Sequence, residues 1–239
     1  MSEQPGQKIF SIYRFNPGQS AHYQEYRLTP DKGMSVLEAL FHILERQDPT
    51  LSFRYSCRGA VCGSCAMYIN GRHRLACNTL VESLKGEKVT ISPLPNLPVI
   101  KDLVVDMTSF YEKIEKAMPF LKTLEARQAE IKQSPKDRER LDIITDCILC
   151  AACHSACPVN WTSKSYLGPA VLNKAYRFIA DSRDDAGEER LSLVDNEDGI
   201  WRCHGIFNCT EACPKKISPA DSIIQLRHSV FAGKKKSRK

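Results

Sequence analysis

The eleven cysteines of this 239-residue chain fall into three groups, at residues 57–77, 147–157 and 203–213. The N-terminal stretch MSEQPGQKIF lacks the basic segment and apolar core of a secretory signal, so we expect a reducing compartment. There, cysteines at this density indicate metal or redox chemistry rather than structural disulfides. The sequence therefore predicts that these thiols bind metal centres.

The first group has the spacing C-x₄-C-x₂-C-x₁₁-C and consists of Cys57, Cys62, Cys65 and Cys77. This arrangement is typical of plant-type 2Fe–2S ferredoxins. Gly59 and Gly63 would allow the unusual dihedral angles needed to wrap a cluster. The alternative is a Cys₄ zinc site, but such sites usually pair two C-x₂-C knuckles and this stretch has one. The spacing predicts a 2Fe–2S cluster.

The second group is a complete C-x₂-C-x₂-C-x₃-C-P box made of Cys147, Cys150, Cys153 and Cys157, followed by Pro158. The third group, CHGIFNCTEACP, would be a second such box if Ile206 were cysteine; its thiols are Cys203, Cys209 and Cys213. In two-cluster ferredoxins the fourth cysteine of each box ligates the other cluster. We expect the two boxes to share their ligands in the same way.

This crossing rule divides the seven thiols into sets of four and three. A 4Fe–4S cluster would take Cys147, Cys150, Cys153 and Cys213. The other cluster would take Cys157, Cys203 and Cys209, with Ile206 at its fourth corner. Three thiolates predict a 3Fe–4S cluster, in which the vacant corner needs no ligand. A 4Fe–4S cluster with water or substrate on its odd iron is the alternative, which the apolar Ile206 disfavours.

The secondary structure expected to position these cysteines changes along the chain, from mainly strands to helices. Strands are expected at KIFSIYRF, HYQEYRLT, LSFRYSC and EKVTISPL, with a helix at residues 35–47 and a hairpin turn at Asn70-Gly71. Helices are expected at residues 109–133 with a break at Pro119, from Pro169 onward, and from Ser218 to Gly233. The pattern predicts an α+β protein with a domain at residues 1–105 and a helical domain at residues 106–239.

Composition narrows the range of functions. With 42% apolar and 26% charged residues the chain is expected to be globular, and no apolar run approaches the roughly 20 residues of a membrane span. Five cations in the final KKKSRK contribute to the net charge of +6. We expect a solvated tail there, with attraction to an anionic membrane surface as the second interpretation. Nucleic-acid binding is not expected, because no aromatic residues interleave with the tail.

Taken together, these motifs closely resemble the iron–sulfur subunit of succinate dehydrogenase and fumarate reductase, which form respiratory complex II. The resemblance spans nearly the whole chain and is carried by SCRGAVCGSCAMYINGRHRLAC, PLPNLPVIKDLVVD, CILCAACHSACP, YLGPAVLNKAYRF, DSRDDAGEERL and RCHGIFNCTEACPK. It implies an N-terminal β-grasp plant-type 2Fe–2S ferredoxin domain and an α-helical, bacterial-ferredoxin-like second domain.

The resemblance also implies partners and a direction of electron flow. A flavoprotein subunit carrying FAD would interconvert succinate and fumarate. Electrons would pass through the 2Fe–2S, 4Fe–4S and 3Fe–4S clusters to quinone at a membrane anchor that often carries haem b. The subunit would itself make no bond to succinate, so no catalytic residue is expected. Because the sequence shows no transit peptide, we expect it to lie peripherally on the cytoplasmic face of a bacterial inner membrane, although a processed mitochondrial chain would look similar.

By the same resemblance, a quinone pocket would be lined by Pro158, Trp161, His204 and Ile206. Relatives often have two adjacent tryptophans where this chain has only Trp161. Packing in the helical core or against the anchor is the alternative role for that residue. His204 would hydrogen-bond the quinone or pass it a proton, or would be bonded by nearby backbone.

Four other functions stay open from the sequence. The enzyme could run as a quinol:fumarate reductase or belong to another quinone-linked flavoenzyme. The chain could also be a free-standing multicluster ferredoxin, although the apolar residues near the third cluster favour a docked subunit. A zinc-stapled scaffold is the structural alternative.

Overall fold

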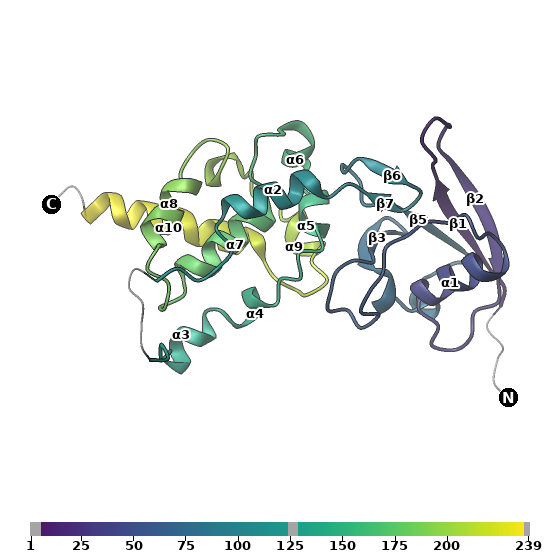
Figure 1. The fold of residues 1–239 in the computed structure, drawn as a ribbon, viewed down its shortest axis with the longest axis horizontal. Coiled ribbons are helices and arrows are strands. Elements are labelled where there is room, and N and C mark those ends of the chain that lie inside the picture. Colours follow the sequence, from purple (N-terminus) through teal and green to yellow (C-terminus); the bar gives the residue numbers. More distant parts are fainter. Residues whose placement is uncertain (1–5, 124–128, 237–239) are drawn as a thin grey trace. The chain divides into compact units, whose positions relative to one another are not determined.

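The computed structural model describes residues 6–123 and 129–236 (Figure 1). The chain forms two compact units, and each is described by itself. The first unit comprises Met1–Met107 and Ile148–Ser155, and the second comprises Thr108–Cys147 and Ala156–Lys239. The middle of the first ferredoxin box therefore packs with the N-terminal part of the chain. The predicted domain division at residues 105 and 106 stays a prediction.

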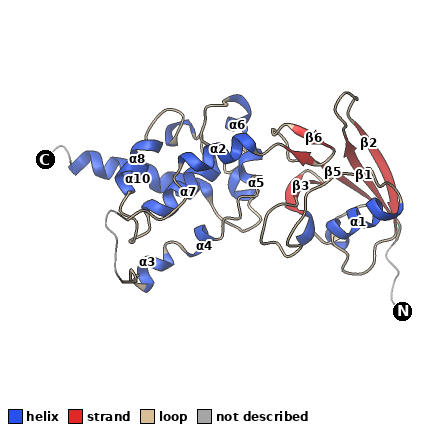
Figure 2. Cartoon of the chain, viewed as in Figure 1, coloured by secondary structure: helices blue, strands red, loops and turns tan. Residues whose placement is uncertain are grey.

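The first unit is built on a mixed five-stranded sheet with the order β2-β1-β5-β3-β4 (Figure 2). Its strands are β1 (Lys8–Arg14), β2 (His22–Leu28), β3 (Ala66–Ile69), β4 (Arg72–Leu75) and β5 (Lys88–Ser92). β1 and β5 run parallel, while the other neighbours are antiparallel. The predicted hairpin is confirmed: Asn70 and Gly71 connect β3 and β4 with φ of 46° and 75°.

Helix α1 (Val36–Arg46) packs into the same core as the sheet. Its start follows from the sequence, because Ser35 caps the helix and Glu38 bonds back to the Ser35 backbone in a capping box. Leu37 and Leu40 on its apolar face are buried, as the helical spacing predicts. The core is thus closed on one side by a single amphipathic helix.

The strand predicted at residues 51–57 is wrong. The segment stays irregular because its backbone bonds elsewhere: the Ser52 N–H donates to the Asp102 carboxylate at 2.9 Å, and the Ser52 carbonyl accepts from Leu103. Asp102 belongs to the Pro-rich region, which forms a small hairpin of β6 (Val99–Lys101) and β7 (Val104–Val105). A buried carboxylate therefore replaces the sheet as the partner of this segment.

The second unit is helical. Its helices are α2 (Thr108–Lys116), α3 (Pro135–Glu139), α4 (Asp142–Thr145), α6 (Pro158–Thr162), α7 (Pro169–Ile179), α8 (Gly187–Val194), α9 (Asn208–Glu211) and α10 (Pro219–Lys236). The short helix α5 (Ala152–Ser155) belongs to the first unit, and three 3₁₀ turns lie at residues 76–78, 81–83 and 200–202. The α+β class is therefore confirmed.

Helices α7 and α10 begin where the sequence predicts. Pro169 opens α7, and the Ser218 hydroxyl accepts from the Asp221 N–H at the start of α10. The predicted end of α10 at Gly233 is wrong, since the helix continues to Lys236. Glycine at this position keeps a negative φ and serves as an ordinary helical residue. The predicted basic tail at residues 234–239 lies outside the residues whose side chains are described.

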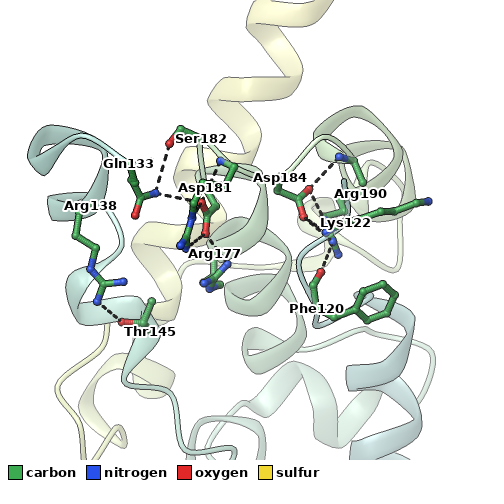
Figure 3. A network of polar contacts seen from close by, with 12 residues as sticks. Phe120, Lys122, Gln133, Arg138, Thr145, Arg177, Asp181, Ser182, Asp184 and Arg190 are labelled. Carbon is green, nitrogen blue, oxygen red and sulfur yellow. Dashed lines mark hydrogen bonds and ion pairs between the residues drawn. The ribbon is translucent and has the colours of Figure 1, made fainter. Parts of the chain in front are cut away.

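The helix predicted over residues 109–133 is realised only in its first part, and residues 124–128 lie outside the described residues. α2 ends at Lys116, and Met118 adopts a φ of 48° just before Pro119. The freed carbonyls of Ala117, Met118 and Phe120 accept hydrogen bonds from Arg190. Figure 3 labels Phe120 and Arg190. A buried guanidinium therefore stabilises the chain where the helix breaks, as Pro119 predicts.

Arg190 lies at the centre of the polar network in Figure 3. Its side chain and that of Asp184 are both fully buried, and they pair at 2.9 Å. A second group in this network joins Asp181 to Arg177 and Arg183 at 2.9 and 2.8 Å. These pairs hold the chain between α7 and α8.

Within the described ranges, no helix combines the length and the apolar character required to cross a membrane.

Candidate iron–sulfur cluster sites

The first cysteine loop wraps around its own thiols. The N–H groups of Gly59, Val61 and Cys62 point at the Cys57 sulfur at 3.4, 3.3 and 3.2 Å. The Ala60 N–H lies 3.4 Å from the Cys77 sulfur. Donors aimed at thiolate sulfurs are what a bound cluster requires of its loop. The donor set therefore fits a 2Fe–2S cluster.

Left-handed backbone makes this wrapping possible. Gly63 has a φ of 73°, as predicted, but Gly59 does not adopt a positive φ. Its neighbours Arg58 and Ala60 do so instead, at 55° and 57°. The prediction for Gly59 is thus wrong. The loop therefore imposes a left-handed conformation on an arginine and an alanine, residue types that rarely adopt a positive φ.

The other two thiols of this site come from the sheet. Cys65 is buried just before β3, and Cys77 follows β4 in the 3₁₀ turn at residues 76–78. The Ala76 N–H donates to the Cys65 carbonyl at 3.0 Å, which ties the two ends of the hairpin together. The predicted fourth thiol therefore approaches from a separate element.

Burial and hydrogen bonding shift the pKa values of these thiols in opposite directions. Burial raises the pKa of Cys65 to about 12, and the neighbouring thiols add to this. The Ser64 side chain and the Cys57 N–H lower the pKa of Cys62 to about 6. Converging thiolates of like charge need a cationic partner, which the irons of a cluster supply when bound.

The second box is also wound with left-handed residues. Leu149 and Ala151, which flank Cys150, have φ of 53° and 60°. In the first unit, Cys150 packs against the hydrophobic core of the sheet. In the second unit, Cys147 and Cys213 pack against one apolar cluster of Leu141, Ile144 and Ile217. Cys153 belongs to the first unit.

The three thiols of the third predicted site lie together in the second unit. Cys157, Cys203 and Cys209 line one open pocket. Ile206 lines the same pocket and is 51% exposed. Burial raises the pKa of Cys157, and it raises the pKa of Cys209 to about 11. Three converging thiols and one aliphatic side chain are the arrangement that a 3Fe–4S cluster would need.

The loop carrying Ile206 has an unusual backbone. Gly205 and Phe207 have φ of 67° and 66°, so Ile206 is flanked by left-handed residues on both sides. Cys150 in the complete box has the same flanking pattern. Ile206 therefore occupies the conformational place of a ligating cysteine without supplying a thiol.

The predicted quinone residues are placed as follows. Pro158, His204 and Ile206 line the pocket of the three cysteines, and His204 is exposed. Trp161 lies on α6 one turn after Pro158, is 48% exposed, and does not line this pocket. The structure therefore brings together three of these four residues around the third site.

Two further residues contact this site, and the sequence analysis did not single them out. Tyr166 is buried in the pocket wall, and its hydroxyl donates a hydrogen bond to the Cys203 thiol. Burial raises the pKa of Tyr166 far above its ordinary value, so it stays a neutral donor. Arg227 on α10 donates to the Cys203 and Ile200 carbonyls at 2.7 and 2.6 Å.

Within the ranges that the structure describes, no group of three His, Cys, Asp or Glu side chains is arranged to share one metal ion. Thiolates that bind a cluster are distributed over more than one iron. The spacing of the cysteines and the donors around the Cys57 sulfur make the cysteine groups candidate cluster ligands.

Comparison with known families supports this assessment. A family model described as a 2Fe-2S iron-sulfur cluster binding domain matches residues 9–112. A second, described as a 4Fe-4S dicluster domain, matches residues 143–217. Fold and matches together define the class: an iron–sulfur electron-transfer protein with a plant-type ferredoxin domain followed by a helical dicluster domain.

Similarity to individual proteins defines the family more specifically than the two family models do. The chain is 44% identical over 230 residues to a mitochondrial succinate dehydrogenase [ubiquinone] iron-sulfur subunit of Candida glabrata, covering 93% of this chain and 91% of that one. It is 46% identical to the succinate dehydrogenase iron-sulfur subunit of Paracoccus denitrificans, covering 92% and 86%. A chain of the Mycobacterium smegmatis Sdh1 complex superposes with a TM-score of 0.87 at 27% identity, covering 95% and 97%.

The chain belongs to the family of succinate dehydrogenase iron–sulfur subunits. It is therefore an electron-transfer subunit of that enzyme.

Proposed function

We propose that this subunit carries electrons from the FAD of a flavoprotein partner to quinone at a membrane anchor. The order would be 2Fe–2S, then 4Fe–4S, then 3Fe–4S. These clusters supply one-electron redox chemistry when bound. The chain's own residues bind them, orient their ligands and shield them from water.

The ligand sets proposed for the three clusters follow the crossing rule. The first is Cys57, Cys62, Cys65 and Cys77; the second is Cys147, Cys150, Cys153 and Cys213; the third is Cys157, Cys203 and Cys209. Backbone donors around the Cys57 and Cys77 sulfurs support the first set. The shared apolar cluster around Cys147 and Cys213 supports their pairing in the second.

One observation carries the proposal for the third cluster. Three thiols and Ile206 line the same open pocket, so the fourth corner faces an aliphatic side chain. A side chain without a lone pair cannot hold a fourth iron. We therefore propose a 3Fe–4S cluster here, although the matching family model is described as a 4Fe-4S dicluster domain.

The same pocket supports the proposed quinone site. His204 is exposed at its rim and can donate to a carbonyl oxygen of quinone, while Pro158 and Ile206 provide apolar walls. Trp161 on the neighbouring helix would contact the quinone or the anchor from beside this pocket. The pocket opens at the surface, as a site shared with an anchor subunit would.

We propose that the enzyme runs toward succinate oxidation, on the cytoplasmic face of a bacterial inner membrane. The anchor would hold the subunit there, with or without haem b. Its curated relatives are named as succinate dehydrogenases, which supports this direction.

Purification of the native complex in detergent tests the whole proposal. The subunit should co-elute with a flavoprotein and lipid, and carry about nine irons and about ten acid-labile sulfides per chain. A monomer without flavin or lipid would show a free-standing ferredoxin. Zinc without iron or sulfide would show a structural scaffold.

The quinone site has its own test. His204→Ala should raise the KM for quinone while succinate oxidation with an artificial electron acceptor is unchanged. His228→Ala is the matched control, because His228 is an exposed histidine of the same unit that does not line the pocket. Equal effects of both variants would overturn the assignment of His204.

A further inference from the structure

Gly63 lies within the C-x₂-C part of the first cysteine loop, between Cys62 and Cys65. In the first unit it faces the backbone of the other ferredoxin box. A Cβ placed on Gly63 would be 2.7 Å from the Cβ of Cys150, and 3.0 Å from both the Cys150 Cα and the Ile148 carbonyl oxygen. These two cysteine loops are therefore in contact backbone to backbone.

This contact leaves no room for a side chain. The opposing atoms belong to the backbone or to a Cβ, so no flexible side chain can move aside. To reach an ordinary separation of 3.4 Å, Cys150 would have to move by at least about 0.7 Å. Other glycines of the first unit differ: Gly71 has nothing within 4 Å, and Gly59 meets only the Cys57 carbonyl at 3.7 Å.

Cys150 belongs to the segment of residues 148–155, and the far end of this segment is held by hydrogen bonds. The Ser155 hydroxyl donates to the Pro95 carbonyl at 2.6 Å, and therefore accepts from His73 Nε2 at 3.0 Å. Asn96 Nδ2 donates to the Ser155 carbonyl at 3.1 Å. Residues 148–155 are thus fixed to the first unit at both ends, by close packing at Gly63 and by polar contacts at Ser155.

We propose that Gly63 is a positioning residue for electron transfer. Its missing side chain lets the loop of Cys150, a ligand of the second cluster, lie directly against the loop that binds the first. The inference rests on the proposed function, because it requires Cys150 to be a cluster ligand.

The physical reason is the dependence of coupling on distance. Magnetic dipolar coupling falls with the inverse cube of the separation, and electron tunnelling falls still more steeply. A small outward movement of the Cys150 loop would therefore weaken both, even if each cluster were intact. The hydrogen bonds of Ser155 hold the far end of residues 148–155. The segment therefore cannot tilt to bring the Cys150 loop back against the Gly63 loop.

The test compares Gly63→Ala with two controls in the intact complex. Gly71→Ala places alanine at nearly the same φ, 75° against 73°, but in open space, so it reports backbone strain alone. Gly86→Ala, in the same unit, places alanine at a φ of 79° and also in open space. In each variant we would measure iron and sulfide content, and the broadening of the reduced 2Fe–2S paramagnetic resonance signal by the second cluster.

Gly63→Ala should reduce this broadening and slow reoxidation of the 2Fe–2S centre, while both controls match the parent. Loss of the second cluster alone, with the 2Fe–2S signal retained, would also support the proposal. Broadening equal to that of Gly71→Ala, with full iron content, would overturn it. A parent complex without two interacting clusters would instead refute the proposed function.

Ser155→Ala covers the case in which Gly63→Ala does not fold. It adds no atoms and removes the bonds to Pro95 and His73. Weaker broadening in this variant would support the fixed loop separation. Broadening identical to the parent's would count against it.

Discussion

Ile206 holds the place where a complete ferredoxin box carries its second cysteine, and its replacement tests the proposed third cluster directly. Ile206→Cys adds a thiol to a pocket that already contains Cys157, Cys203 and Cys209. Left-handed residues on both sides give position 206 the same backbone setting as Cys150, a proposed ligand of the second cluster. We therefore expect the new thiolate to bind a fourth iron.

The structure indicates that this exchange costs little stability. Full burial of an isoleucine side chain stabilises a protein by about 1.5–3 kcal/mol, and Ile206 is 51% exposed. The loss on replacement by cysteine is therefore below about 1 kcal/mol, small against the stability of a folded domain. A change in the cluster would then reflect ligation rather than unfolding.

Iron analysis and electron paramagnetic resonance provide the assay. In the oxidised variant the 3Fe signal should disappear, while iron rises by about one atom per chain and sulfide is unchanged. Ile206→Ala is the matched control: it removes the same side chain without adding a ligand, and should keep the 3Fe signal. A variant with full iron content and an unaltered 3Fe signal would refute the assigned geometry.

Three further predictions concern residues around the sites. Tyr166→Phe removes the hydrogen bond to the Cys203 thiol, so the midpoint potential of the third cluster should fall in a redox titration; an unchanged potential would contradict a tuning role. Arg190→Met leaves the buried Asp184 carboxylate unpaired and should destabilise the second unit by about 3–5 kcal/mol in thermal unfolding, and adding Asp184→Asn should recover part of this loss. Burial lowers the pKa of His73 to about 4, below the ordinary value of about 6.5. The unfolded chain therefore binds a proton that the folded chain excludes, and stability should decrease as pH falls from about 6.5 to about 4; His73→Gln should flatten this part of the pH profile, and an unchanged profile would show that His73 is not its source.

Spacing along the chain was enough to predict the local features. The C-x₄-C-x₂-C array, the Asn70-Gly71 turn and the start of the helix at residue 35 each depend on a few consecutive residues, and the structure contains the turn and the helix. Short-range features of this kind are predictable because the backbone dihedrals and hydrogen bonds of neighbouring residues determine them. Predictions over longer segments were less reliable, as the absent strand at residues 51–57 shows.

Within the candidate sites, the types of the ligating residues were predictable but their surroundings were not. The eleven cysteines, and Ile206 in place of a twelfth, are visible in the printed sequence. Nothing in it links Tyr166 to Cys203, which is 37 residues away, or Arg227 to the Cys203 carbonyl. Such contacts depend on how helices pack, and helix packing is set by many weak interactions at once.

The sequence by itself determined the chemistry of this protein, because cysteine spacing limits which clusters a loop can enclose. Only the tertiary structure decided that residues 148–155 pack with the first unit, and that Gly63 meets Cys150 there at a distance that excludes a side chain. Close approach between segments far apart in the chain depends on the shape of the whole packed unit, which no local pattern encodes.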